Sequence, residues 1–154
     1  MRPGARRRRP TEVRRLRPSA PPTVEPLEVY ERNGDGHTLG RHCASSPAVE
    51  SDRLARHHEL PATGSFSDAT TAQRCVEACV AANRDEVRDW CDGQGLRLVI
   101  DHDMQEVIGG VLTRRRWAAG DSTPLPASAL RVVLRRHTGY ASGFAILTAY
   151  PRLR

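Results

Sequence analysis

The segments ALRVVLRR at residues 129–136 and FAILTAY at residues 144–150 decide the fold of this chain. In the first segment, large apolar side chains alternate with arginines and one valine, which is typical of a strand with one buried face. The second segment is rich in apolar and β-forming residues and ends at Pro151, which cannot continue a sheet ladder. Because the connecting loop HTGYASG holds two glycines, we expect the two segments to pair as an antiparallel hairpin.

The segments upstream of this hairpin predict helices followed by more strands. LRLVID at 96–101 and VIGGVL at 107–112 are short β-rich runs around a polar turn, and they suggest another hairpin. Residues 68–91 repeat apolar side chains at spacings of three and four after a capping Asp, which predicts a helix. A shorter helix is expected over 49–60, before Pro61. The predicted fold class is therefore α+β, with N-terminal helices packed on a twisted antiparallel sheet.

Charge divides the 154-residue chain into a basic tail and a nearly neutral body. Residues 1–24 hold eight of the 24 arginines and one acidic residue, whereas the rest holds 16 arginines and 17 acidic residues. The tail also has many prolines and few large apolar residues, so it does not bury enough surface to fold alone. We therefore expect a disordered linker over 1–27 and one folded domain over 28–154. The arginines of such an arm also attract nucleic-acid phosphates.

Several protein classes are excluded by composition. No apolar run reaches the roughly 18 residues that a membrane helix needs, and no apolar segment follows the basic N-terminus as in a secretory signal. The cysteines at positions 43, 75, 79 and 91 do not follow a double CxxC zinc pattern, and they are too few for a disulfide scaffold. We expect no bound metal and no cofactor.

The end of the last strand places two hydroxyl groups together. With a period of two, Phe144, Ile146, Thr148 and Tyr150 are expected to share one face. A pair of hydroxyls beside one arginine and one histidine supplies a proton acceptor, a fixed positive charge and neutral donors around a phosphate. Such a group is able to act on a phosphodiester without a metal. On its own, a TxY sequence is also compatible with ordinary edge residues.

Five further segments, in order, carry a family resemblance. They are GHTLGRH at 36–42, LAR at 54–56, SFSD at 65–68, AANRDEVRDW at 81–90, and VVLRR with ILTAYP near the C-terminus. In this order and spacing they resemble the bacterial ribonuclease A-like toxin domain. This domain lies at the C-termini of contact-dependent growth inhibition and other polymorphic toxins. The resemblance covers about residues 35–151 and implies a kidney-shaped, ribonuclease A-like α+β fold.

The resemblance also implies a set of active residues. His42 matches the histidine of the RH pair, Arg56 the arginine of LAR, and Thr148 with Tyr150 the TxY. Because the chain between His42 and the LAR segment is longer than expected, Arg53 is the alternative phosphate ligand.

Two histidines compete for the role of base. His37 and His42 are five residues apart, a separation that regular structure does not direct at one phosphate. We favour His42 as the base and retain His37 as a second candidate; a kink in the segment would allow both to contribute.

The implied chemistry is attack of the ribose 2′-hydroxyl on the adjacent phosphorus, which gives 2′,3′-cyclic phosphate ends and spares DNA. Arg131 and Arg135 are candidates for flanking phosphates, with a solvated strand face as the alternative. The expected partners are RNA, with tRNA among the candidates, and a cognate immunity protein. We expect a monomer that is secreted or delivered and acts in the cytoplasm of a target cell.

Two other interpretations stay open at this stage. In a non-catalytic RNA-binding module, the arginines hold phosphates while the histidine and hydroxyls only pack. An immunity or adaptor protein with the same α+β plan needs no convergence of these side chains. Both are distinguished from an enzyme by whether the histidine, arginine and hydroxyls meet within reach of one phosphate.

Overall fold

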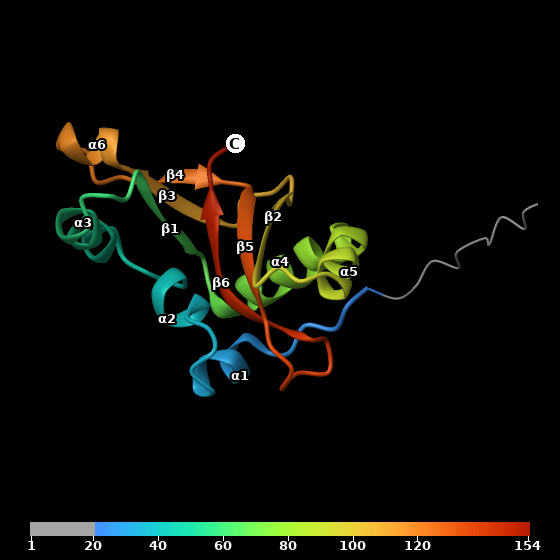
Figure 1. Cartoon of the computed structure of the whole chain (residues 1–154). Helices are drawn as coiled ribbons and strands as arrows, with labels where there is room; N and C mark the ends of the chain where they lie inside the picture. Colours follow the sequence, from blue (N-terminus) through green and yellow to red (C-terminus); the bar gives the residue numbers. More distant parts are fainter. Residues whose placement is uncertain (1–20) are drawn as a thin grey trace, which may run out of the picture.

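A computed structural model describes residues 21–154 of the chain (Figure 1), so most of the predicted basic tail lies outside the described residues. The helices are α1 (Leu27–Arg32), α2 (Thr38–His42), α3 (Pro47–Arg56), α4 (Ala69–Ala82), α5 (Arg84–Asp92) and α6 (Arg114–Ala118). The strands are β1 (Ala62–Phe66), β2 (Arg97–Asp103), β3 (Gly109–Thr113), β4 (Leu125–Ala127), β5 (Ala129–Arg136) and β6 (Phe144–Arg152). The predicted α+β fold class is confirmed.

The strands form two antiparallel sheets of three strands each. Sheet A has the order β1-β3-β4, and sheet B has the order β2-β5-β6. The predicted C-terminal hairpin is confirmed, since β5 pairs with β6 over their lengths. The predicted alternation in β5 also holds, because Leu130, Val132 and Leu134 are fully buried while Arg131, Val133 and Arg135 are partly exposed.

The main core lies between α4 and sheet B. Helix α4 begins at Asp68, whose carboxylate accepts a hydrogen bond from the Thr71 backbone N–H at 2.7 Å, as the sequence predicts. Its inward face is fully buried and consists of Ala72, Cys75, Val76, Cys79 and Val80. These side chains pack with the buried face of β5 in one cluster, and Figure 1 shows α4 and α5 together beside this sheet. The opposite face of sheet B is thereby left free for other contacts.

The predicted hairpin of residues 96–101 and 107–112 was wrong. Strand β2 pairs with β5, which lies some 30 residues further along the chain, and β3 pairs with β1 and β4. The distant partner matches better, because Ile100 pairs with Val132 on the buried face. Gly109 fits β3 against β1, since a Cβ there would lie 2.0 Å from the Ser65 carbonyl oxygen.

The predicted helix over residues 68–91 is divided into α4 and α5 at Asn83. The Asn83 side-chain amide donates to the Cys79 carbonyl at 2.8 Å and to the Asp101 carbonyl at 3.2 Å. A side chain that binds backbone in this way competes with helix continuation. The predicted 49–60 helix is also shorter at its C-terminal end, because α3 ends at Arg56.

The folded part begins slightly before the predicted boundary. Val24 packs against the core, and Leu27, at the end of the predicted tail, is 2% exposed. Within residues 21–154, no helix is long and apolar enough to cross a membrane.

Strand β6 contains a bulge that reverses its faces. Leu134 pairs with Ile146 and Val133 pairs with Thr148, so Leu147 is an extra residue on β6. Because Leu134 and Val133 point to opposite faces, Ile146 and Thr148 do so as well. The prediction that Phe144 and Ile146 share a face with Thr148 and Tyr150 was therefore wrong. The two hydroxyl residues still share a face with each other, and it is the face opposite α4.

Candidate active site

His42 lies at the junction of the two sheets. It is the last residue of α2 and is only 5% exposed. Its Nδ1 lies 2.9 Å from the carbonyl oxygen of Gly64 in β1, and its ring centroid lies 5.3 Å from that of Tyr150 in β6. Gly64 also lets β1 come close to β6, since a Cβ at this position would lie 2.3 Å from the Pro151 carbonyl oxygen. The imidazole is thus fixed by sheet A and lies beside the ring of Tyr150 in sheet B.

The Gly64 contact fixes the protonation of the ring. A carbonyl oxygen only accepts hydrogen bonds, so Nδ1 of His42 carries the hydrogen and Nε2 of the neutral ring is a free acceptor. Burial lowers the pKa of His42 to about 4; the Gly64 carbonyl opposes this effect, and the positive charge of Arg53 adds to it. At neutral pH the ring is therefore uncharged and ready to take a proton on Nε2.

The structure brings Arg53, and not Arg56, to this imidazole. Nη1 of Arg53 lies 3.4 Å from Nδ1 of His42 and 3.4 Å from the Arg41 carbonyl oxygen. Since Nδ1 already donates to Gly64, the guanidinium acts on the ring as a nearby charge and not as a hydrogen-bond donor. Arg56 lies one turn further along α3, where it pairs with Asp52 and its side chain is 73% exposed. The predicted site position of Arg56 is thus occupied by Arg53.

Thr148 and Tyr150 lie on the face of β6 that points away from α4. Oγ1 of Thr148 is buried and has no hydrogen-bond partner among the described residues. Tyr150 lies opposite Arg131 in the strand register, and the two side chains interact. Arg131 is itself held by Asp101 through two hydrogen bonds of 2.8 and 2.9 Å. Thr148 therefore has an unused donor, whereas Tyr150 is oriented by an ordered arginine.

His37 is a neighbour of His42 and lies outside regular structure. Its backbone occupies the position before α2, with φ of −149°, and the two ring centroids are 6.5 Å apart. Burial lowers the pKa of His37, and the positive charge of Arg41 adds to this effect. The backbone leaves helical geometry at His37 itself, whereas Thr38–His42 form the regular helix α2.

The segment Gly36-His37-Thr38 holds the bulge of β6 from its free edge. The His37 backbone N–H donates to the Leu147 carbonyl at 3.1 Å, and the Ala149 N–H donates to Oγ1 of Thr38 at 3.0 Å. Gly36 is required here, because a Cβ would lie 2.4 Å from the Ile146 carbonyl oxygen. Each residue of the segment thus meets a backbone group around the extra Leu147. We call these three residues the bulge clamp.

Residues 36–151 match the family described as the bacterial CdiA-CT RNAse A domain. This match covers most of the chain and includes all the residues of the site. The chain belongs to this family. It is thus a ribonuclease toxin domain of contact-dependent growth inhibition, as the sequence resemblance predicts.

One solved structure has the same fold as this CdiA-CT domain. It is the crystal structure of a CdiA-CT/CdiI complex from Y. kristensenii 33638, with a TM-score of 0.67 and 24% identity. The comparison covers 76% of this chain and 99% of the other. No curated protein sequence matches the chain significantly.

The remaining predicted residues of the CdiA-CT domain have ordered partners. Arg131 is bound to Asp101, and Arg135 lies 3.0 Å from Asp35. Arg135 and Arg131 both lie on the open face of sheet B, on the same side as Thr148. Within residues 21–154, no three His, Cys, Asp or Glu side chains gather as metal ligands would.

The sequence did not reveal two contributors to the site of this CdiA-CT domain. Gly64 acts through its backbone carbonyl, for which a glycine in a strand gives no specific signal. Thr38 acts as an acceptor for a backbone N–H, and the GHT segment marked its position but not this role.

Proposed function

We propose that the domain is a metal-independent endoribonuclease that cleaves RNA by transesterification and leaves 2′,3′-cyclic phosphate ends. The observation that carries this proposal is the buried, neutral His42, whose Nδ1 is held by the Gly64 carbonyl and whose ring lies 5.3 Å from that of Tyr150 in β6. Arg53 and Tyr150 approach this imidazole from two other parts of the chain, and Thr148 lies on the same face of β6 as Tyr150, which supports the proposal. A module that only binds RNA has no need for a desolvated imidazole with a fixed tautomer.

His42 acts as the general base in this proposal. Its Nε2 takes the proton of the ribose 2′-hydroxyl while the 2′ oxygen forms a bond to the adjacent phosphorus. The bond between phosphorus and the 5′ oxygen of the next nucleotide then breaks. General-base catalysis of this kind typically contributes about 10²- to 10⁴-fold. When the substrate phosphate is near, its negative charge favours the protonated ring and strengthens the base.

Arg53 holds the non-bridging phosphate oxygens in this proposal, and it takes the role that the sequence assigned to Arg56. Its guanidinium lies beside the imidazole and has no carboxylate partner among the described residues. A planar guanidinium binds two phosphate oxygens at once and stabilises the charge that develops on them. Arg56, by contrast, is already paired with Asp52 at the surface.

Thr148 and Tyr150 complete the site as neutral donors. The unpartnered hydroxyl of Thr148 donates to a phosphate oxygen, and that of Tyr150 gives its proton to the leaving 5′ oxygen. The phenolate formed in this step lies beside the positive charge of Arg131, the cross-strand neighbour of Tyr150. Arg131 thus orients and stabilises the acid, so its direct role in RNA binding is secondary.

The biological setting that we propose follows the family. The structural neighbour is a complex of CdiA-CT with CdiI. We infer that this domain also has a cognate immunity protein as its partner. The domain acts as a monomer on RNA, with tRNA among the candidates, in the cytoplasm of a target cell. The basic segment that precedes Val24 serves as the linker from the part that delivers it.

The test is cleavage of total RNA by the purified domain in excess EDTA, followed by analysis of the product ends. We expect cyclic phosphate ends from the wild type and none from His42→Ala. His58→Ala is the matched control, because His58 is an exposed histidine beyond the end of α3 and has no role in the proposed site. Cleavage by His42→Ala at the wild-type rate, with folding shown by circular dichroism, would refute the proposal. Loss of activity in EDTA with recovery on Mg²⁺ addition would refute metal independence.

A further inference from the structure

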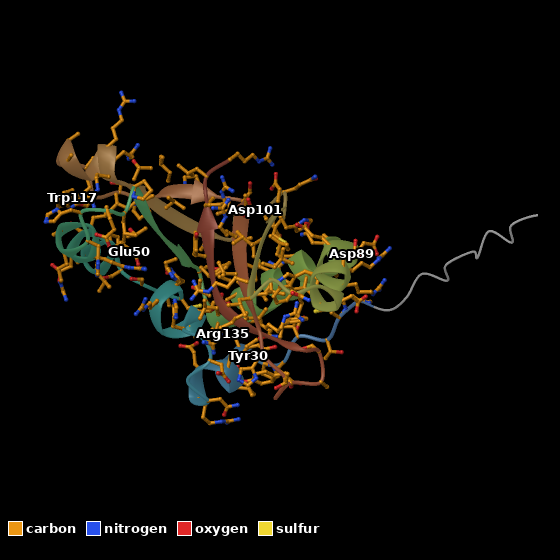
Figure 2. All side chains as sticks on the ribbon, viewed as in Figure 1. Tyr30, Glu50, Asp89, Asp101, Trp117 and Arg135 are labelled. Carbon is orange, nitrogen blue, oxygen red and sulfur yellow. The ribbon has the colours of Figure 1, made fainter. Side chains whose placement is uncertain are left out.

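Sheet B has an open face that the proposed chemistry does not fully use. Helix α4 covers one face of β2 and β5, and within residues 21–154 no other helix makes extensive contacts with these two strands. On the face that carries Thr148 and Tyr150, the side chains of β5 are therefore partly exposed and those of β2 exposed, whereas Ala145 and the Thr148 hydroxyl on β6 are buried. Figure 2 marks Asp101 and Arg135 near opposite ends of this sheet.

The strand register defines three rows of side chains across this face. The rows are Asp101–Arg131–Tyr150, Val99–Val133–Thr148, and Arg97–Arg135–Ala145. Neighbouring strands lie about 5 Å apart, so each row runs roughly 10 Å from β6 to β2. Two of the rows start at the proposed catalytic hydroxyls, and the third starts at Ala145. We call this surface the open face.

The middle row is an apolar platform. Val99 is 48% exposed, and its cross-strand neighbour Val133 is partly exposed. Thr148 follows directly in the same row, with its buried hydroxyl unpartnered. A flat nucleobase whose ribose lies at Thr148 would cover both valines and remove them from water.

The third row places two positive charges side by side. Arg97 and Arg135 are directly opposite each other in the register, and like charges in this position destabilise a sheet. Arg135 is compensated by Asp35, whereas Arg97 is exposed and has no ion pair with any residue that the structure describes. An anion bound between them would relieve this repulsion.

We propose that the open face binds the single-stranded RNA nucleotide next to the cleaved linkage, with its base on Val99 and Val133 and its outer phosphate at Arg97. This inference rests on the proposed function, since it extends the same substrate from the same hydroxyls. The platform is continuous with the candidate active site, and its charge is complementary to a phosphate. Apolar contact to a base face is tolerant of sequence, so the surface favours an additional nucleotide over a particular base.

The test compares a ribodinucleotide with versions that carry one more nucleotide on either side. On the extended substrate whose added nucleotide reaches the open face, Arg97→Ala is expected to lower kcat/KM about 5-fold, because an exposed ion contact contributes up to about this factor. The kcat/KM for the dinucleotide should not change. The salt dependence of log kcat/KM should also become shallower by about 0.7, the value for one phosphate contact on a single strand. Val99→Ala should lower kcat/KM about 3-fold, and this loss should vanish with an abasic nucleotide at that position.

The control variants are Arg115→Ala and Val107→Ala. Arg115 is an exposed arginine of α6, and Val107 is 69% exposed outside sheet B. If Arg97→Ala and Arg115→Ala behave alike while the wild type cleaves RNA, the open-face proposal is overturned and the proposed function stands. Binding of a fluorescent 2′-O-methyl trinucleotide, which is not cleaved, tests the open-face proposal independently of the proposed function. If the wild type does not cleave but Arg97→Ala still weakens this binding selectively, the proposed function fails and the surface remains. If Arg97→Ala weakens binding of an immunity protein but not of RNA, the surface belongs to the protein partner and our assignment is wrong.

Discussion

Lowering the pH from 7 to 4 is expected to destabilise the domain through His42. The pKa of this histidine is about 4 in the folded state, because the ring is buried, and about 6.5 in the unfolded chain. The unfolded state therefore binds a proton between these two values that the folded state does not. The contribution to stability is complete above about pH 6.5, is lost as the pH falls, and changes no further below about pH 4. With 1.36 kcal/mol for each pKa unit, the loss is about 3 kcal/mol.

Urea denaturation at intervals between pH 7 and pH 4 measures this loss. Carboxylates also titrate at the acidic end, so the informative quantity is the difference between the wild type and His42→Gln. Gln is unable to titrate, and its amide N–H is able to donate to the Gly64 carbonyl. The free energy of unfolding of His42→Gln should thus fall about 3 kcal/mol less than that of the wild type. The exposed His58→Gln serves as the control, and its curve should run parallel to the wild type. Parallel curves for His42→Gln would show that the ring is not desolvated and would refute the argument.

Four other outcomes are expected. The kcat/KM of the free enzyme should rise with pH through an acidic limb near the His42 pKa of about 4, and a limb near 6.5 in initial-rate measurements would contradict the burial of the base. Thr38→Val leaves the buried Ala149 N–H without its acceptor; kcat should drop about 10- to 100-fold with KM little changed, whereas Thr38→Ser should restore kcat. Equal rates for Val and Ser would exclude a positioning role for the hydroxyl. Arg53→Lys should lower kcat by about 10-fold or more while Arg56→Lys changes it less than about 2-fold, and the reverse order in single-turnover assays would return the phosphate to Arg56. Glu50 is 3% exposed, and neither of its carboxylate oxygens has a hydrogen-bond partner within residues 21–154. Glu50→Gln should therefore increase the free energy of unfolding by about 1–3 kcal/mol. A decrease in thermal or urea stability would contradict this reasoning.

The alternation of side chains predicted much of sheet B but not the face of its last strand. In β5 the period of two predicted the faces correctly, because this strand has no extra residue. In β6 the extra Leu147 reverses the faces between Ile146 and Thr148. Bulges are often marked by glycine, but LTAY contains none, so the reversal had no local signal. It is imposed by the bulge clamp, which is more than 100 residues away in sequence.

The sequence predicted a site residue correctly where a short motif marks its position. It failed where the orientation of a helix determines which of two similar residues reaches the site. His42 and Tyr150 come from motifs and have rings 5.3 Å apart, and Thr148 shares a face of β6 with Tyr150. Arg53 and Arg56 are only three residues apart, so their sequence context is almost the same. Only the docking of α3 on β1 determines which guanidinium reaches the imidazole. Strand pairing failed for a related reason, because β2 chooses a distant partner with a better apolar match over its neighbour in sequence.

Because the Gly64 carbonyl orients His42, catalysis reports on how the sheet A half and the sheet B half of the molecule assemble. The sheet A half orients the base and the sheet B half supplies the hydroxyl donors, and the two halves touch where Gly64 meets Pro151. An intermediate with either half formed alone holds all the necessary side chains but no working arrangement of them. The emergence of cleavage during refolding should therefore coincide with the docking of the halves and follow the formation of each.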